Sequence, residues 1–580
     1  MSSLPPVVIM LIAAALVALI PNLNTRRLIT IGAPLLVLGQ LFWVLDDGSS
    51  WNLTWLSLEL EPLHVDRLSL VFGYVFTIAA TLGGIYAWHL NDRFQQSAAL
   101  GYAGTSIGVV FAGDLLTLIL FWELMALTSA YLIWAGGFSQ SKAAGTRYLY
   151  VHMVGGSVLL AGILLHLGAG GSLDFTIFEG SIAGWLILGG FAINAAIVPL
   201  HAWLSDAYPE AGITGSVFLS AFTTKTAVYV LARGFAGWDL LIFLGVIMAL
   251  YGVVFAVLEN DIRRLLAYHI ISQVGYMVTA VGIGTEVALN GAASHAFAHV
   301  IYKGLLFMGA GAAIYATGRR TLTALGGISD RMRTVVVLYM IGAFAISAFP
   351  LFSGFVSKSM VIFAAEEEHM SWVVALLYLA SVGTFLHTGL KLPYFIWFGP
   401  RRDDIKVNPV PRGMIIAMFF AAALCVGIGV YPRALYDVLP YANHYEPYTS
   451  DHIVSTLQML GFTAIGAWLL RHKLKGESSV TLDTDWFYRK AQTPVRVLIQ
   501  HPLEQFFTFF ERLVHFTARK LSLLAMVPTS GWAGILKRIG YAQRNGNEAA
   551  LAFLSRPPIG IVIAAILFTF SIIFLIGALT

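Results

Sequence analysis

Three ionisable side chains repeat at helical spacing within one apolar stretch of the chain. His295, His299 and Lys303 stand four residues apart, so a helix would place all three on one face. Two imidazoles and an amine in a row could pass a proton, directly or through water, because histidine titrates near neutral pH. The same residues could instead form structural hydrogen bonds. Zinc binding by the histidine pair is a third interpretation, although no HExxH pattern accompanies it.

Further ionisable residues interrupt other apolar stretches. Glu123 and Lys225 each lie well inside such a stretch, Lys358 follows a segment rich in helix breakers, and Lys391 follows His387. A charge near the centre of a bilayer is costly, so we interpret these residues as candidates for an ion path. For Glu123 and Lys225 the alternative is a static ion pair between helices. For Lys391 and His387 it is a position close enough to a membrane surface to reach water.

The composition indicates that these stretches lie in a membrane. Apolar residues make up 58% of the 580 residues and charged residues only 11%, whereas soluble proteins carry about 25% charged residues. A net charge of +4 over this length is too small to indicate nucleic-acid binding. The single cysteine, Cys425, excludes disulfide frameworks and thiolate metal sites. No P-loop or GxGxxG motif is present, and we expect no cofactor, no metal and no catalytic centre in this chain.

The apolar runs predict an all-α polytopic membrane protein with about sixteen transmembrane helices. The predicted helices span residues 5–21, 28–45, 66–88, 99–112, 115–134, 148–168, 181–199, 214–235, 240–258, 265–284, 289–316, 335–363, 371–398, 412–431, 453–470 and 559–580. Broken helices are expected near Pro199 and near Pro350, because proline cannot continue a helix regularly.

The charges of the loops test this count. Every second loop is rich in Lys and Arg and the intervening loops are acidic, as expected if the basic loops face the cytoplasm. This alternation predicts that both termini face outward. The loop 200–213 is an exception on the cytoplasmic side, because it holds Asp206 and Glu210 but no basic residue.

The predicted helices divide the chain into five parts. Residues 1–98 hold the N-terminal transmembrane helices, 99–398 form the proton-conducting core, 412–470 add further helices, and 559–580 form a last one. Residues 471–558 are more polar. Their central part mixes phenylalanines with charged residues, which predicts an amphipathic helix along the cytoplasmic membrane surface or against a partner protein. A cytoplasmic linker with some helix is the alternative.

Several ordered motifs resemble the antiporter-like subunits shared by respiratory complex I, membrane-bound hydrogenases and multisubunit Mrp cation/proton antiporters. They are Phe-Trp-Glu-Leu-Met at 121–125, Pro-Leu-His-Ala-Trp-Leu at 199–204, Asp-Ile-Arg-Arg-Leu-Leu-Ala-Tyr at 261–268 and Tyr-Lys-Gly-Leu-Leu-Phe at 302–307. Two more, Asp-Thr-Asp-Trp-Phe-Tyr-Arg at 483–489 and Leu-Lys-Leu-Pro-Tyr at 390–394, look most similar to the D-type subunits of Mrp antiporters.

The resemblance implies two inverted five-helix repeats, here 99–235 and 240–398, each with a broken helix. By motif position, Glu123 matches the family's glutamate on the fifth helix and Lys225 its lysine on the eighth. His299 matches the histidine on the eleventh helix, and Lys358 the charged residue after the break of the twelfth. The expected proton path therefore comprises Glu123, Lys225, His295, His299, Lys303, Lys358 and Lys391.

Two positions depart from the family pattern. Asn194 stands where the family usually has a lysine, and Gln273 stands where a histidine is often found. Glu123 would thereby lose its usual cationic partner. We therefore hypothesise that the first half of the path is altered or electrically silent, while the half with His299, Lys303 and Lys358 retains proton transfer.

The resemblance implies a proton-translocating subunit of a multisubunit complex in the bacterial inner membrane, with Mrp-type antiport of Na⁺ or K⁺ against protons. A proton-pumping subunit of a complex I-like NADH:quinone or ferredoxin-linked oxidoreductase is one alternative. The proton channel of an inorganic-carbon uptake system and a structural spacer protein are two others. The expected partners are other membrane subunits, lipid, protons and the exchanged cation, with no nucleic acid.

Overall fold

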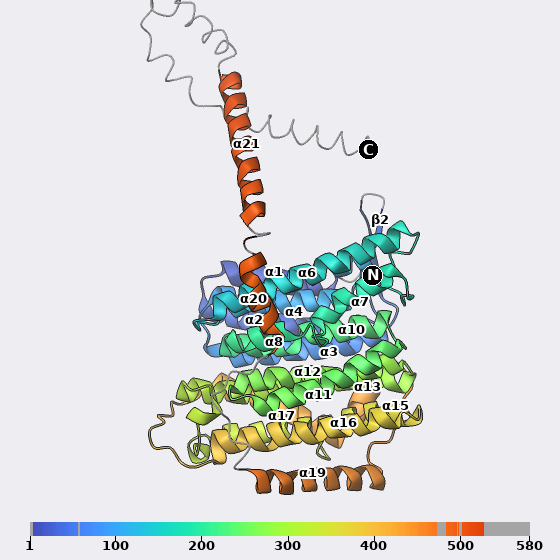
Figure 1. Ribbon diagram of the computed structural model, residues 1–580, viewed down its shortest axis with the longest axis vertical. Coiled ribbons are helices and arrows are strands. Elements are labelled where there is room, and N and C mark those ends of the chain that lie inside the picture. The colour runs from blue at the N-terminus through green and yellow to red at the C-terminus, as the bar shows by residue number, and fades with distance from the viewer. Residues whose placement is uncertain (1–3, 56–57, 472–482, 496, 498–500, 527–580) are drawn as a thin grey trace, which may run out of the picture. The chain divides into compact units, whose positions relative to one another are not determined.

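The computed structural model describes residues 4–55, 58–471, 483–495, 497 and 501–526 of the chain. The chain divides into two compact units, Met1–Asp485 and Trp486–Thr580. Among the described residues, every helix that is long and apolar enough to cross a membrane belongs to the first unit, and these helices run side by side (Figure 1).

A short hairpin lies between the second and third helices of the chain, and the all-helical prediction did not include it. Helices α1 (Pro6–Leu19) and α2 (Leu23–Trp43) precede the antiparallel strands β1 (Ser50–Trp55) and β2 (Leu58–His64), and α3 (Arg67–Tyr86) follows. The strands occupy the stretch that we expected to be an acidic loop. A hairpin satisfies the backbone hydrogen bonds of this segment without adding a transmembrane element.

The central helices follow the predicted order. They are α4 (Arg93–Val110), α5 (Leu115–Trp134), α6 (Ser141–Gly168), α7 (Ile182–Asn194), α8 (Ala202–Ala207), α9 (Ile213–Ala221), α10 (Thr223–Gly234), α11 (Asp239–Leu258), α12 (Ile262–Ile283), α13 (Glu286–Thr317), α14 (Arg333–Ile346), α15 (Ser353–Glu367), α16 (Ser371–Thr384), α17 (Arg412–Val430), α18 (Arg433–Tyr436) and α19 (Ser450–Leu470). Short 3₁₀ turns are η1 (Ala87–His89), η2 (Tyr208–Glu210), η3 (Leu322–Ala324) and η4 (Ser329–Arg331), and π-helical segments are η5 (Phe385–Lys391) and η6 (Tyr394–Phe398).

Ten helices among the described residues are long and apolar enough to cross a membrane, and three shorter apolar helices accompany them. The prediction of a multi-pass α-helical membrane protein is confirmed. The count of sixteen is not, partly because the predicted helix 559–580 lies outside the described residues. The predicted helix 371–398 also changes character, since α16 continues as the π-helical segments η5 and η6.

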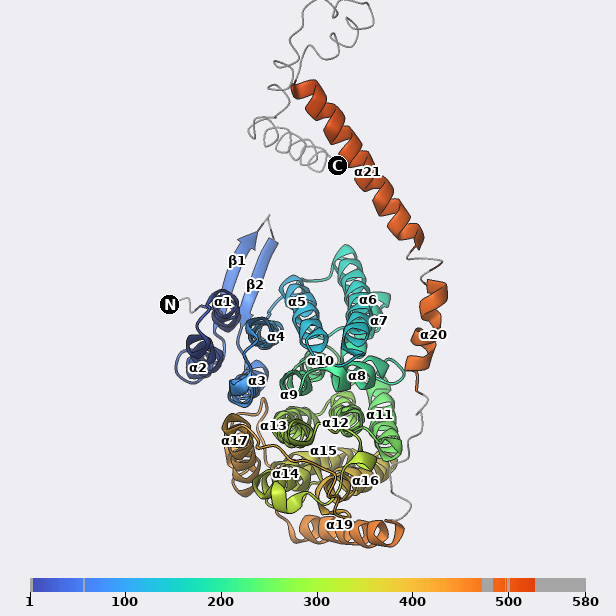
Figure 2. The same ribbon diagram turned by 90° about the vertical axis from the view of Figure 1, so that its left-hand side faces the viewer.

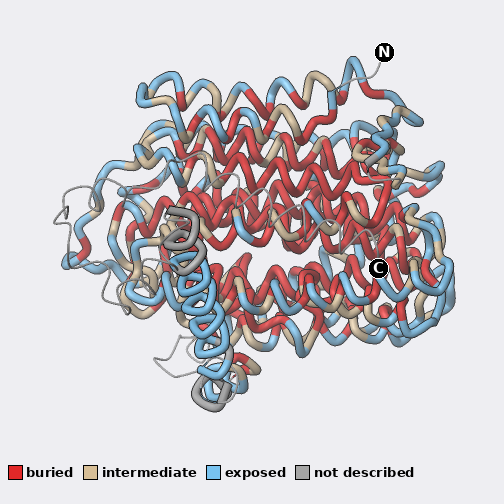
Figure 3. Tube along the Cα trace, turned by 90° about the horizontal axis from the view of Figure 1, so that it is seen from above, coloured by how far each residue is buried: buried red, intermediate tan, exposed pale blue. Residues whose placement is uncertain are grey.

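The most buried helices lie in the middle of the first unit. Figure 2 shows α12 and α13 between the pair α9–α10 and the pair α14–α15. The most apolar stretches of α13 and of α9–α10 are completely buried, and the most apolar stretch of α12 is 94% buried. Figure 3 shows that buried residues concentrate in the middle of the bundle, while exposed residues lie toward its margins. Helix α13 contacts α9, α12, α14 and α15, so its polar side chains face protein rather than lipid.

Both predicted helix breaks are present, and their turns have the same geometry. Helix α7 ends at Asn194 and Ala196 follows with φ of 56°, while α14 ends at Ile346 and Ala348 follows with φ of 56°. Positive φ is uncommon for residues other than glycine and ends the helical path. A third interruption at Phe222, with φ −100° and ψ −75°, separates α9 from α10. We had expected one continuous helix there, since no proline or glycine marks the interruption.

Aspartates at two other helix starts repeat a second pattern. Asp114 accepts backbone hydrogen bonds at the start of α5, and Asp261 does so at the start of α12. Each aspartate also forms an isolated β-bridge, to Asp174 and to Thr321 respectively. The two parts of the core therefore share helix starts and helix breaks of the same type.

The second unit contains most of α20 (Asp485–Val495) and all of α21 (His501–Met526). Helix α21 carries exposed phenylalanines together with charged residues, as in an amphipathic helix. Its role at a membrane surface or a partner stays a prediction. The rest of the predicted segment 471–558, beyond residues 471, 483–495, 497 and 501–526, lies outside the described residues.

Candidate functional site

Lys225 lies at the interruption between α9 and α10 and is completely buried. Its Nζ atom donates to the carbonyl oxygen of Ser220 at 2.7 Å and to Oγ1 of Thr224 at 3.1 Å. Ser220 is in the last turn of α9, where carbonyl groups lose their helical partners. The ammonium group thus binds the negative end of a helix, a position that favours a cation.

Lys358 repeats this arrangement at the second broken helix. Its Nζ atom donates to the carbonyl oxygen of Ile346, the last residue of α14, at 2.9 Å. The same atom lies 5.2 Å from the ring centroid of Tyr276, within the range of a cation–π contact. Lys358 is buried in the second turn of α15.

Lys391 also binds the end of a helix. Its Nζ atom donates to the carbonyl oxygens of Val257 at 2.5 Å and Glu259 at 3.1 Å, where α11 ends. Among the residues that the structure describes, none of the ion pairs includes Lys225, Lys358 or Lys391. The static ion pair considered for Lys225 is therefore not formed within these residues, and each amine is held by backbone carbonyls instead.

The predicted row on α13 is buried, but its members differ in their contacts. Nδ1 of His295 lies 3.1 Å from Oγ of Ser357, and its Nε2 lies 3.5 Å from the Tyr302 hydroxyl. The His295 and His299 ring centroids are 6.3 Å apart. Within the described part of the chain, neither nitrogen of His299 nor Nζ of Lys303 has a hydrogen-bond partner. Buried polar groups of this kind are rare and call for an explanation such as function.

A line of polar side chains runs from α13 through α12 to the last residue of α16, directly before the π-helical segment η5. The Tyr302 hydroxyl donates to Oε1 of Gln273 at 3.4 Å, and Nε2 of Gln273 donates to Oγ1 of Thr384 at 3.3 Å. Thr388, one turn later, lies 2.6 Å from Nε2 of His269. The altered family position Gln273 therefore still bridges two elements.

His269, Tyr302 and Thr388 were missed in the sequence analysis. His269 could have been found by the criterion applied to Lys225, since it is an ionisable residue inside a predicted transmembrane helix. Its ring centroid lies 5.8 Å from that of His387, and both rings are buried. Thr388 and Tyr302 carry no charge, and only the packing of α12, α13 and η5 identifies them.

Hydroxyl groups cluster beside Lys225. Oγ1 of Thr223 lies 2.6 Å from the Tyr102 hydroxyl and 3.5 Å from that of Tyr148, which lies 2.8 Å from Oγ of Ser129. The His152 ring stacks on Tyr148 with centroids 4.0 Å apart. These side chains come from α4, α5, α6 and α10, so no local sequence pattern predicts the cluster.

Glu123 lies apart from this buried set. Its side chain is half-buried on α5 and lies against Gly156 of α6. Among the described residues, it forms no hydrogen bond or ion pair. Asn194 is fully buried, and neither atom of its amide has a hydrogen-bond partner within the same residues. This chain therefore gives Glu123 no cationic partner in the part that is described.

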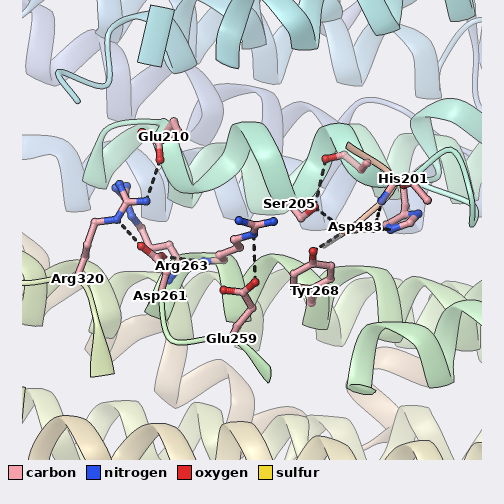
Figure 4. A network of polar contacts seen from close by, with 12 residues as sticks. His201, Ser205, Glu210, Glu259, Asp261, Arg263, Tyr268, Arg320 and Asp483 are labelled. Carbon is pink, nitrogen blue, oxygen red and sulfur yellow. Dashed lines mark hydrogen bonds and ion pairs between the residues drawn. The ribbon is translucent and has the colours of Figure 1, made fainter. Parts of the chain in front are cut away.

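The acidic loop 200–213 is neutralised by arginines from other segments. Asp206 binds Arg147 through two hydrogen bonds of 2.7 and 2.8 Å. Glu210 binds Arg320 at 2.8 Å, and the same guanidinium group binds Asp261 (Figure 4). The apparent exception in the charge alternation is thus an ion-paired segment, and its arginines come from α6 and from the segment after α13.

Comparison with known proteins identifies the family. Residues 112–385 match the family model described as "NADH:quinone oxidoreductase/Mrp antiporter, TM". The chain is 32% identical over 372 residues to the uncharacterized protein MJ1309 of Methanocaldococcus jannaschii, a match covering 60% of this chain and 77% of that protein. The chain belongs to the NADH:quinone oxidoreductase/Mrp antiporter family.

Two further proteins are similar to this chain over long stretches. A Na(+)/H(+) antiporter subunit of Alkalihalophilus pseudofirmus is 30% identical over 426 residues, covering 64% of this chain and 53% of that protein. The chain thus spans about half the length of that relative. A chain of the archaeal membrane-bound sulfane sulfur reductase has the same fold, with a TM-score of 0.70, 22% identity, and coverage of 97% of this chain and 99% of that chain.

Proposed function

We propose that this family member translocates protons as one subunit of a larger membrane complex, and that it takes part in Mrp-type antiport of Na⁺ or K⁺ against protons. One observation carries the proposal. Lys225, Lys358 and Lys391 are buried, and each donates to backbone carbonyls where a helix ends. Buried amines held by dipoles alone are suited to gaining and losing a proton.

The physical argument is a balance of two opposed effects. Burial favours the neutral amine, whereas the carbonyl dipoles at a helix end favour the ammonium ion. Burial and the carbonyl dipoles therefore act in opposite directions on the charge of Lys225 and of Lys358. A nearby charge could then switch either residue between its two protonation states, as a carrier of protons requires.

Helix α13 lies between the helix that carries Lys225 and the helix that carries Lys358. It contacts both α10, which carries Lys225, and α15, which carries Lys358. His295, His299 and Lys303 lie on it, and the last two have no hydrogen-bond partner in the described chain. We propose that protons pass between Lys225 and Lys358 through this row, and on to Lys391 along Tyr302, Gln273 and the polar line to η5.

The proposed location is the bacterial inner membrane, with the loop 200–213 and its arginines on the cytoplasmic face. Arg147, Arg263 and Arg320 meet this loop through hydrogen bonds to Asp206, Ala211 and Glu210, respectively. The positive-inside tendency places such a cluster in the cytoplasm. The proposed partners are further membrane subunits.

A redox-driven proton pump is the second candidate. The family description names NADH:quinone oxidoreductase beside Mrp antiporters, and the sulfane sulfur reductase chain shares the fold over nearly the whole length. In that case, a different protein of the complex would carry the electron-transfer centres.

Inside-out vesicles with the whole native complex test these proposals. We expect Na⁺ or K⁺ to dissipate a pH gradient with the wild type, and expect Lys225→Ala and Lys358→Ala to abolish this response. Lys142→Ala is the control, because Lys142 is exposed at the start of α6. A gradient that forms only on adding an electron donor would favour the redox-driven pump, and transport by both lysine variants at the wild-type rate would contradict the proton path.

A further inference from the structure

Asp483 brings a buried carboxylate from the C-terminal part of the chain into the core. Its side chain has no exposed surface. Its oxygens accept hydrogen bonds from the hydroxyls of Tyr268 at 2.5 Å and Tyr251 at 2.6 Å, from Nε2 of His201 at 3.2 Å, and from Oγ of Ser205 at 3.4 Å (Figure 4). Four side-chain donors thus converge on one carboxylate.

These donors come from the first broken helix and from two helices that contact the proposed proton path, since α12 carries Gln273 and the end of α11 binds Lys391. His201 lies in the break after α7 and directly before α8, and Ser205 lies on α8. Tyr251 and Tyr268 lie on α11 and α12. Oγ1 of Thr484 adds a hydrogen bond of 3.3 Å to the carbonyl oxygen of Pro199 within the same break. The segment therefore joins the first broken helix to the helices of the second repeat.

The surroundings keep Asp483 charged. Burial by itself raises the pKa of the Asp483 carboxyl, but the hydrogen bonds from His201, Tyr251 and Tyr268 outweigh burial and hold the pKa below its ordinary value. The other charged groups of the cluster are Arg264, which pairs with Glu259 at 3.3 Å, and Asp485.

We infer that Asp483 is a positioning residue of the proton path. Its carboxylate holds His201 and α8 in register with α11 and α12, so the segment that continues into α20 sets the geometry of the first broken helix. The assignment rests on the proposed proton-translocating function and specifies it further. A displacement of Asp483 would leave buried donors without an acceptor, which proteins avoid.

A residue that only stabilised the fold would behave differently. Its substitution would lower the amount of assembled complex but leave the transport rate per complex and its pH profile unchanged. A positioning residue alters the rate itself, because its loss releases His201 and α8 from their place beside α11 and α12. The two roles are therefore distinguished by measurements on equal amounts of assembled complex.

The experiment compares Asp483→Asn, Asp483→Glu and wild type in inside-out vesicles that carry the whole complex. We expect Asp483→Asn to lower the transport rate roughly tenfold, as for the loss of one charged buried hydrogen-bond acceptor. We also expect its pH profile to move toward lower pH, because the loss of a buried negative charge disfavours protonated groups nearby. Amide hydrogen exchange should rise over residues 195–207. Asp483→Glu should restore part of the rate, because it keeps the charge.

Asp404→Asn is the matched control, since Asp404 is an exposed acid that pairs with Arg319. Wild-type rate and pH profile in Asp483→Asn, together with an inactive Lys358→Ala, would overturn the positioning role alone. Normal transport by Lys358→Ala would instead contradict the proposed function, and the positioning role with it. Faster amide exchange without any change in transport would show that Asp483 only stabilises the fold, and it would also overturn the inference.

Discussion

The ammonium group of Lys225 donates a hydrogen bond of 2.7 Å to the carbonyl oxygen of Ser220 in the last turn of α9. Lys358 makes the equivalent bond of 2.9 Å to Ile346 at the end of α14. The two lysines lie on different helices, α10 and α15, and each lies just beyond an interruption of the helical path. An interruption therefore does more than bend a helix, because it exposes the carbonyl that holds the amine.

Substitution by arginine tests whether these positions need only a positive charge or a group that can also release its proton. Arginine keeps the cation and can still donate to a carbonyl, but it does not release its proton at any accessible pH. We expect Lys358→Arg to lose cation-dependent proton transport almost as completely as Lys358→Ala, measured in vesicles as decay of a pH gradient.

Lys142→Arg is the control for this exchange, since Lys142 is exposed. Assembly of the complex, followed on native gels, should be similar for Lys358→Arg and wild type. Full transport by Lys358→Arg would mean that Lys358 supplies only a fixed positive charge.

A methyl group on Gly156 tests the position of Glu123. A Cβ atom built there would lie 1.5 Å from Oε1 of Glu123, so Gly156→Ala must displace the carboxylate. If Glu123 belongs to the path, Gly156→Ala should lower transport to about the level of Glu123→Gln. Gly168→Ala, at the end of the same helix, is the control because nothing lies within 4 Å of its Cβ position. Equal transport by both alanine variants would remove Glu123 from the path.

Ionisable residues inside transmembrane helices could be predicted because the local sequence alone shows a charged side chain among apolar neighbours. Such a placement has a high free-energy cost. Lys225 and Lys358 stand out against apolar neighbours, and Pro199 and Pro350 mark two of the breaks. The interruption at Phe222 has no such marker. Its turn depends on tertiary packing, which no helix propensity of a single residue describes.

Contacts between segments that are far apart in the chain could not be predicted from the sequence, for a different reason. His201 and Asp483 are separated by 282 positions, and each looks ordinary in its own segment. Asp483 was noticed only as part of a motif. The hairpin β1–β2 was missed because its strands are short and β2 carries Glu59 and Glu61, a composition equally typical of a loop.

The ion pair between Asp66 and Arg233 gives a prediction on stability. Asp66 begins α3 and binds Arg233 at 2.5 Å and the backbone N–H of Ser69 at 2.7 Å. Burial opposes the charge, yet Arg233 and Ser69 hold the pKa of Asp66 below its ordinary value. Because the folded-state pKa is lowered, this stabilisation is present above about pH 4, the ordinary pKa of aspartate, and is lost as the pH falls through the folded-state pKa.

Asp66→Asn should therefore lower stability at neutral pH by about 1–2 kcal/mol, the scale of a hydrogen bond to a charged group. It should also reduce the acid sensitivity of thermal unfolding in detergent. Asparagine still caps a helix, so the change isolates the ion pair. Asp92→Asn is the control, because Asp92 caps α4 with no arginine among its described ion-pair partners. An equal loss in both variants would show that Arg233 contributes nothing.

Asn194→Lys tests whether the first half of the path is altered by its missing cation. Asn194 is the last residue of α7, fully buried, and its amide has no hydrogen-bond partner among the described residues. An amine at the end of α7 could bind free carbonyls there, as Lys358 does at the end of α14. We expect Asn194→Lys to change the rate of proton transport in vesicles and to make that rate more sensitive to Glu123→Gln. Asn194→Met, which has similar length but no charge, is the control. If Asn194→Lys and Asn194→Met both transport like the wild type, the missing cation is not what distinguishes this half of the path.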